Sequence, residues 1–293
     1  MSSRFEWAIG AAAVLAAVAF SARELTPHTV TRNSIAPHAI APHAVRPVLR
    51  VCADPNNLPF SNRAGAGFEN RIAALVARDL GDSVAYTWWP QRRAWVRNTI
   101  NAKKCDVAIG VPSGFGPLLT TRPYYQSTYV FVSRADRNYR LASLDDPRLR
   151  RLRIGLHFIG TDYDNPPPAH ALGDRGIVRN IVGYSIYGNY AEPNPPAALI
   201  EAVARGDVDV AVAWGPLAGY FAKHSPVPLT ISPIVPSTDP RTGSVFAFPI
   251  AMGVRQGDTH LRDALQRAID HDAARIHAIL AEYGVPVLAR PEE

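Results

Sequence analysis

From residue 48 onward, short apolar runs alternate with longer segments whose apolar residues repeat at helical spacing. The first run, residues 48–51, predicts a strand. A helix follows, because the next apolar positions share one helical face and Gly81 comes directly after the last of them. These positions are Phe68, Ile72, Leu75, Val76 and Leu80. Strands are also predicted at residues 84–88 and 106–111, with a helix that begins at Pro90 between them.

A second series of strands and helices begins near residue 129. It contains a helix that is capped by Asn194 and closed by Gly206. Strands are predicted at residues 129–132, 153–156, 208–213 and 246–254, and the last helices at residues 258–272 and 274–283. Repeated β-α-β units of this kind predict an α/β protein with two lobes and a cleft at the carboxyl ends of its strands.

The last predicted strand returns the chain to the first series, which sets the expected domain boundaries. Residues 48–128 and 251–293 would form the first lobe, and residues 129–250 the second. The chain would then cross between the lobes twice, near residues 128–130 and 249–251. Two lobes with two crossings are typical of a protein that binds something in the cleft between them.

The first 47 residues predict export. Arg4 precedes an apolar run at residues 7–20, and small residues follow it, so residues 1–22 have the form of a secretory signal peptide. The run is shorter than the ~20 residues of a membrane-spanning helix, although an uncleaved anchor stays open as an alternative. Residues 23–47 repeat a Pro-His-Ala unit without hydrophobic period, which predicts a flexible tether. The expected location is the periplasm.

Composition and cysteine usage agree with an exported globular protein. Apolar residues make up 47% of the chain and charged residues 19%, which excludes a disordered protein. The formal charge of +6 comes almost entirely from arginine, and no basic run alternates with aromatic residues, so nucleic-acid binding has no support. In an oxidising compartment the two cysteines favour a Cys52–Cys105 disulfide, with two buried free thiols as the alternative.

No arrangement typical of catalysis or metal binding is present in the predicted folded part. His157 is near Thr161 and Asp162, but no serine elbow, Cys-His pair or pair of acids accompanies it. The spacing of histidines typical of a zinc site is missing as well. We therefore expect a protein without catalytic residues, metal or cofactor.

Six segments agree, in order, with one narrow family. They are residues 51–62, 89–93, 105–107, 119–125, 187–196 and 214–220. In these segments the chain resembles the solute-binding-like proteins of the MxaJ/XoxJ type, which are associated with quinoprotein alcohol dehydrogenases of methylotrophic bacteria. The resemblance extends through nearly all of residues 48–285. It implies the periplasmic binding protein type II fold and an accessory role in the maturation or activation of a PQQ-dependent methanol dehydrogenase. That enzyme, together with its cytochrome c, is the implied partner, and the family has no agreed small ligand.

Two positions differ from those of amino-acid-binding proteins of the same fold. Those proteins carry an arginine in the loop that corresponds to residues 112–119, where this chain has none. They also usually carry an aspartate where this chain has Trp214. The arginine that pairs with the carboxylate of an amino acid and the aspartate that pairs with its ammonium group are thus both missing. Burial of these two charges without partners would cost several kcal/mol. The sequence therefore disfavours an amino-acid ligand.

The candidate cleft residues lie at predicted strand ends or in the family-like segments. They are Asp54, Asn56, Asn57, Phe60, Arg93, Phe115, Arg122, Tyr124, Tyr125, His157, Trp214 and Tyr220. The aromatic members suit a hydrophobic peptide, a protein loop or an aromatic ligand. Trp214 could equally pack in the core, and Asp54 could cap its own turn. Arg93 and Arg122 could hold an anion or form surface ion pairs.

Two other functions stay open from the sequence. The first is the receptor of an ABC transporter for an uncharged or aromatic solute. The second is an enzyme on the same fold, such as a dehydratase, for which no acid–base pair stands out.

Overall fold

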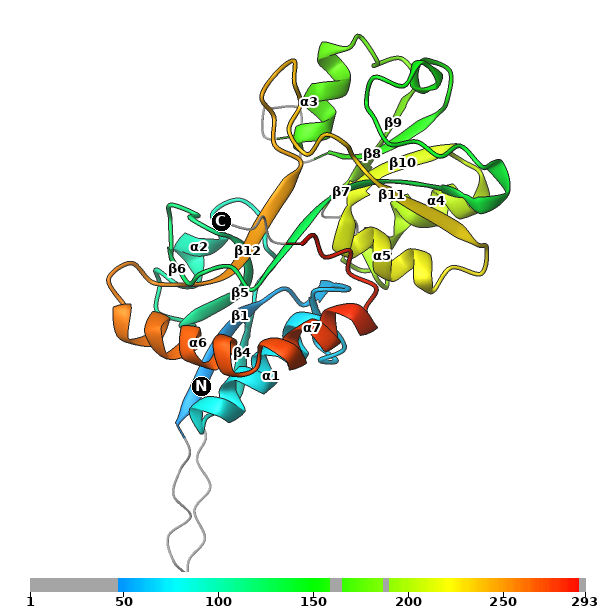
Figure 1. Cartoon of the computed structure of the whole chain (residues 1–293). Helices are drawn as coiled ribbons and strands as arrows, with labels where there is room; N and C mark the ends of the chain where they lie inside the picture. Colours follow the sequence, from blue (N-terminus) through cyan, green and yellow to red (C-terminus); the bar gives the residue numbers. More distant parts are fainter. Residues whose placement is uncertain (1–46, 159–164, 187–189, 290–293) are drawn as a thin grey trace, which may run out of the picture. The chain divides into compact units, whose positions relative to one another are not determined.

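The computed structural model describes residues 47–158, 165–186 and 190–289, all within one compact unit (Figure 1). The expected signal peptide and most of the expected tether lie outside these residues. Among the residues described, no helix has both the length and the apolar character needed to span a bilayer.

The fold is built on one mixed sheet with the strand order β4-β1-β5-β12-β7-β10-β8-β9. Its strands are β1 (Val48–Ala53), β4 (Ser83–Trp88), β5 (Val107–Pro112), β7 (Tyr125–Arg134), β8 (Ile154–Phe158), β9 (Ile181–Ser185), β10 (Val210–Trp214) and β12 (Ala247–Val254). Off this path, β6 (Leu119–Thr120) pairs with β12 and β11 (Leu229–Pro233) pairs with β7. A separate small hairpin joins β2 (Asn56–Asn57) to β3 (Ser61–Asn62).

Strands β7 and β12 join the two ends of the sheet. They are antiparallel, with Thr128 opposite Ala247 and Tyr125 opposite Ile250. β12 also pairs with β5, and β7 also pairs with β10. The first half-sheet (β4-β1-β5) and the second half-sheet (β10-β8-β9) are each parallel within themselves. The two predicted crossings are confirmed, while the exact residue limits of the lobes stay a prediction.

Each half-sheet has its own helices and its own apolar core. The first half-sheet is covered by α1 (Phe68–Leu80), α6 (Thr259–His271) and α7 (Ala273–Glu282). The second carries α3 (Pro167–Asp174), α4 (Ala198–Arg205) and α5 (Gly215–Lys223). Burial of an apolar face by each helix against its half-sheet supplies most of the driving force for folding.

Two predicted helices differ from the structure at their beginnings. The helix expected to begin at Pro90 is wrong in extent: α2 covers only Trp95–Asn98, because Ala94 has a φ of 65°, which no right-handed helix can include. The helix expected from Asn194 begins as a 3-10 turn, Pro195–Ala197, and continues as α4. Its end at Gly206 is confirmed, with a φ of 81° that glycine adopts without strain.

The predicted disulfide is confirmed. Cys52 and Cys105 are bonded, with their Cα atoms 5.4 Å apart. Cys52 lies on β1 and Cys105 precedes β5, so the bond links neighbouring strands of the first half-sheet. It is buried beside Val96 and Ile100.

Candidate functional site

A cavity of about 400 Å³ lies where the carboxyl ends of β1 and β10 meet. Its described lining combines aromatic rings with amides and two carboxyl groups. The lining residues are Asp54, Asn56, Asn57, Phe60, Glu69, Gln91, Gly110, Pro112, Tyr129, His157, Pro167, Ile186, Tyr190, Pro196, Trp214, Leu217, Phe248 and Ile250. The volume is typical of sites for small ligands.

Asp54 follows β1 directly and anchors one side of the cavity. It is only 1% exposed, yet its carboxylate accepts three hydrogen bonds. The donors are the backbone amides of Asn56 and Gln91, at 2.9 and 2.8 Å, and the hydroxyl of Tyr190, at 2.6 Å. In the hydrogen bond from Asn56, the side chain of Asp54 caps its own turn, which is one of the two roles considered for it from the sequence. These three hydrogen bonds stabilise the negatively charged carboxylate of Asp54 despite its burial.

The segment that begins at Tyr190 ties the second half-sheet to the first. Besides the Tyr190–Asp54 bond, the amide of Asn56 donates to the carbonyl of Glu192 at 2.8 Å. The side-chain oxygen of Asn56 accepts a hydrogen bond from the backbone N–H of Asn194 at 3.3 Å. The guanidinium of Arg92 lies over the Tyr190 ring, 4.6 Å from its centre. Together these contacts form a polar tie across one edge of the cavity, and the structure is closed there.

Aromatic rings form the opposite wall. Trp214, at the end of β10, makes edge-type contacts with Tyr129 of β7 and Phe248 of β12, with ring centres 5.3 and 5.9 Å apart. Phe60 lines the cavity from the side of the hairpin. Trp214 is partly buried and packs against the first core. Both roles considered for it from the sequence are therefore compatible with its position.

Glu69, the second residue of α1, is a buried acid at the cavity. It is 6% exposed, and the structure gives its carboxyl no hydrogen bond or ion pair within the described residues. Burial first, and the nearby charge of Asp54 second, raise the pKa of Glu69 well above its usual range. One carboxyl oxygen lies against Gly110 of β5, at a place that the Cβ of any other residue would occupy.

The described residues that line the cavity supply no positive charge of their own at physiological pH. No lysine or arginine stands among the described residues that line it. Burial lowers the pKa of His157 to about 4, so its imidazole is neutral at physiological pH. Burial also raises the pKa of the Tyr129 hydroxyl, which keeps it neutral. The described lining thus carries the carboxylate of Asp54 and no cationic side chain, and the guanidinium of Arg92 lies outside the lining, over the Tyr190 ring.

Six of the twelve predicted cleft residues line this cavity: Asp54, Asn56, Asn57, Phe60, His157 and Trp214. Tyr124 and Tyr125 instead lie in the first core, where Tyr125 packs edge-on against Phe68. Tyr220 is on α5 and stacks on Tyr283, with ring centres 5.6 Å apart. Tyr124 and Tyr125 therefore pack in the core under α1, outside the cavity lining.

The predicted arginines lie elsewhere. Arg122 is exposed and pairs with Asp270 of α6 at 2.6 Å, which is the surface ion pair considered from the sequence. Arg93 and Phe115 line a separate hollow of about 500 Å³ beside α2, together with Arg92 and Arg97. Whether any of the twelve residues binds a ligand stays a prediction.

The sequence did not point to several lining residues. Glu69 and Gln91 lie in or next to predicted helices, and Tyr129 and Phe248 lie in predicted strands, but none of the four was predicted at the cleft. Tyr190 lies in the family-like segment 187–196, but nothing in the sequence placed it at the cleft. One signal was available for Glu69: it is an acid on the apolar side of α1, next to the buried Phe68.

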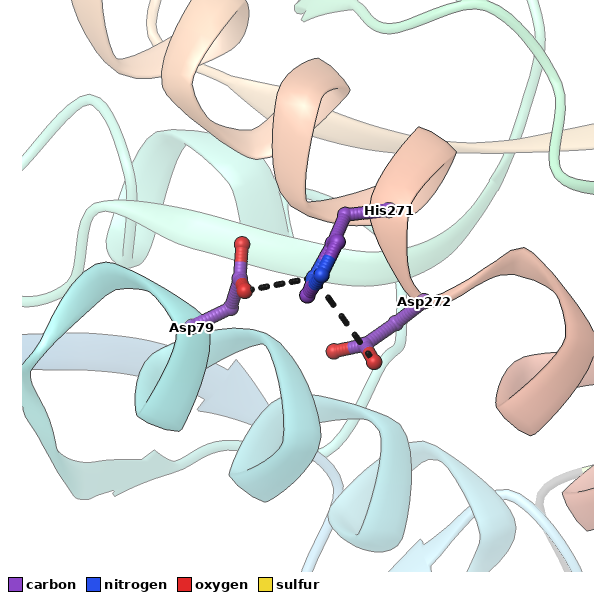
Figure 2. A group of neighbouring side chains, drawn as sticks. All are labelled: Asp79, His271 and Asp272. Carbon is purple, nitrogen blue, oxygen red and sulfur yellow. Dashed lines mark ion pairs between the residues drawn. The ribbon is translucent and has the colours of Figure 1, made fainter.

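One group of side chains in the described part of the chain has a geometry that could hold a metal ion (Figure 2). Asp79 of α1, His271 of α6 and Asp272 after α6 point toward one another, and His271 Nδ1 lies 2.7 Å from Asp79. Asp272 is also paired with Arg275 at 2.7 Å. That cation already neutralises one carboxylate, so the group is explained as an ion-pair network that fastens α6 to α1.

The geometry of the main cavity supports binding. Asp54 and Asn56 are held by hydrogen bonds to the backbone and to Tyr190, and no nucleophile with an adjacent base is present among the described lining residues. A bound molecule would contact rings on one side and carboxyl and amide groups on the other.

No protein-family model matches the sequence. A MoxJ protein from Methylorubrum extorquens is 34% identical over 82% of this chain and 81% of that protein. The crystal structure of the periplasmic binding protein XoxJ from Methylobacterium extorquens is 37% identical, with a TM-score of 0.68 over 83% of this chain and 100% of that chain. MxaJ from Methlophaga aminisulfidivorans is 25% identical, with a TM-score of 0.69 over 82% of this chain and 100% of that chain.

Proposed function

The chain belongs to the MoxJ family, whose structural relatives XoxJ and MxaJ share its fold, and from that premise we propose an accessory function in the periplasm. The protein binds a PQQ-dependent methanol dehydrogenase and assists its maturation or activation. The enzyme's cytochrome c is a second possible partner. The protein itself catalyses no reaction.

The observation that carries this proposal is the chemistry of the cavity. It has an aromatic wall around Trp214 and, among its described lining residues, no lysine or arginine. An amino acid bound there would bury its carboxylate without a partner, at a cost of several kcal/mol. The same argument disfavours an anionic quinone as the direct occupant. The scaffold of a binding protein is thus kept, while the lining disfavours an amino acid as its ligand.

An aromatic wall suits docking of a protein loop. Tyr, Trp and Phe side chains supply large contact areas at low entropic cost and dominate the energetics of many interfaces. The cavity has room for a few side chains of a partner. Export to the periplasm is supported by the disulfide between Cys52 and Cys105, which an oxidising compartment maintains.

Affinity capture tests the proposal. The tagged full chain is incubated with a periplasmic extract of the organism, and the bound proteins are identified by mass spectrometry. We expect the dehydrogenase to be recovered, and we expect Trp214→Ala to reduce its recovery about tenfold. Trp89→Ala is the matched control, because Trp89 lies outside the cavity lining and contacts Lys104 instead. Equal recovery by both variants would contradict docking at the aromatic wall.

A second candidate function is favoured by one observation. The polar tie between Tyr190 and Asp54 closes one edge of a cavity of small-molecule size, as expected for the receptor of an ABC transporter. Capture of a transporter permease without any dehydrogenase would support this function and overturn the first.

A further inference from the structure

Glu69 has no assigned task in the proposed docking, yet its position is well defined. The second residue of α1 is an acid that is 94% buried, and its carboxyl reaches the cavity. Among the neighbouring polar groups of the described residues, Asp54 accepts three hydrogen bonds and Asn56 is bonded to the segment after Tyr190. The buried hydroxyl of Tyr124 has no hydrogen-bond partner among these residues. The carboxyl of Glu69 makes no hydrogen bond within the described residues, so its hydrogen-bonding capacity is open to an occupant of the cavity.

The backbone of β5 fixes where this carboxyl lies. Gly110 has a φ of 81°, and a Cβ built on it would overlap an oxygen of Glu69. The missing side chain therefore leaves the space in which the carboxyl of Glu69 sits. A residue with a side chain at this position would push the carboxyl away from the cavity floor.

The charges and rings around the cavity select the kind of occupant. Asp54 supplies a second carboxyl group, His157 is neutral, and no lysine or arginine lines the cavity within the described residues. A negative potential in a poorly solvated site favours a cation. Trp214, Tyr129 and Phe248 line the cavity, and their rings suit a cation that also carries apolar carbon, because ring quadrupoles attract positive charge.

We propose that the cavity binds a small organic cation: an ammonium ion that carries apolar carbon and no carboxylate. Its ammonium group lies at the carboxyl of Glu69, and its carbon atoms lie against the wall formed by Trp214, Tyr129 and Phe248. A bare metal ion does not fit, since the oxygen and nitrogen atoms of Asp54, Glu69 and His157 do not gather within the described residues into a metal-type group. This inference goes beyond the proposed partner and does not depend on it.

Binding of such a cation is coupled to loss of a proton. Burial raises the pKa of Glu69 and so favours its protonated form in the empty cavity, whereas an ammonium ion beside it stabilises the carboxylate form. The other titratable groups that face Glu69 are Asp54 after β1, Tyr86 on β4, and Tyr124 and Tyr125 at the start of β7. The pKa values of the three tyrosines are raised, so they stay neutral and release no proton. Affinity for the cation therefore increases with pH until Glu69 is ionised in the empty protein.

Isothermal titration calorimetry of the full chain tests the proposal. The probes are ethylammonium, butylammonium, benzylammonium and tetramethylammonium ions, with butanol and benzyl alcohol as neutral matches and benzoate as the anionic match. We expect at least one matched ammonium ion to bind about tenfold more tightly than its alcohol, and benzoate not to bind. Titrations in buffers of different ionisation enthalpy report the proton release on the unaltered protein.

The variant Glu69→Gln keeps the size of the side chain and removes its charge. We expect it to lose the preference for the ammonium ion and the proton release, while Glu201→Gln, at an exposed position of α4, keeps both. Three results would each overturn the proposal: no probe cation binds, the alcohol binds as tightly as its ammonium match, or the unaltered protein releases no proton. Capture of the dehydrogenase is a separate readout, so failure of either proposal is recognised independently of the other.

Discussion

Removal of one hydroxyl group tests whether the polar tie holds the cavity closed. In Tyr190→Phe the ring and the contact of the Arg92 guanidinium with its face remain, while the hydroxyl loses its 2.6 Å hydrogen bond to Asp54 and its hydrogen bond with Arg92. Hydrogen bonds to a charged group contribute about 1.5–3 kcal/mol. Asp54 keeps its two backbone donors at 2.8 and 2.9 Å, so it is not left unpaired. We therefore expect a loss near the lower end, about 1.5–2 kcal/mol.

This energy translates into a change that hydrogen exchange can measure. A loss of about 1.5–2 kcal/mol increases the population of the open tie roughly 10- to 30-fold. The backbone amide of Asn194, which donates to Asn56 across the tie, should exchange faster by that factor. Tyr139→Phe is the control, because Tyr139 packs against the second half-sheet and lines no part of the cavity. Unchanged exchange at Asn194 in Tyr190→Phe would refute the role of the tie.

Three further substitutions test the account. Gly110→Ala should cost about 1 kcal/mol in urea denaturation because of its left-handed φ, and it should abolish ammonium binding in calorimetry by displacing Glu69. Asp239→Asn should cost roughly 2 kcal/mol at pH 6, since buried Arg175 lowers the pKa of Asp239 from 3.8 to about 2. That contribution is full above pH 3.8 and is lost as the pH falls toward 2, so urea denaturation curves of the variant and the parent should converge there. Replacing both cysteines by serine should cost about 4 kcal/mol on the chain-entropy model, visible as a lower Tm that reducing agent reproduces in the parent.

The periodic pattern predicted most of the fold because it reports burial. Phe68, Ile72 and Val76 lie on the buried face of α1, as their spacing required. The pattern predicted too long a helix near Pro90. The positive φ of Ala94 prevents a helix from beginning before residue 95, and no glycine in the sequence indicates this conformation. Local sequence carries little information on such a position, because tertiary contacts impose it.

The candidate site was predictable only where position along a strand decides the outcome. Asp54 follows β1 directly and Trp214 is the last residue of β10, and these strand ends meet at the cavity. Tyr124 and Tyr125 were expected at the cleft because they are aromatic, but the pairing of β7 with β12 turns them into the core under α1. The contact between Tyr190 and Asp54 joins residues 136 positions apart, and no local signal encodes it.

The central claim is that the protein binds a methanol dehydrogenase, and a titration of the two purified proteins tests it most directly. The dehydrogenase from the same organism is added to the full chain, and complex formation is followed by analytical ultracentrifugation. We predict saturable binding that Trp214→Ala weakens about tenfold and Trp89→Ala leaves unchanged. Absence of a complex at concentrations up to about 100 µM, for the PQQ-free and the PQQ-loaded enzyme alike, would contradict the account.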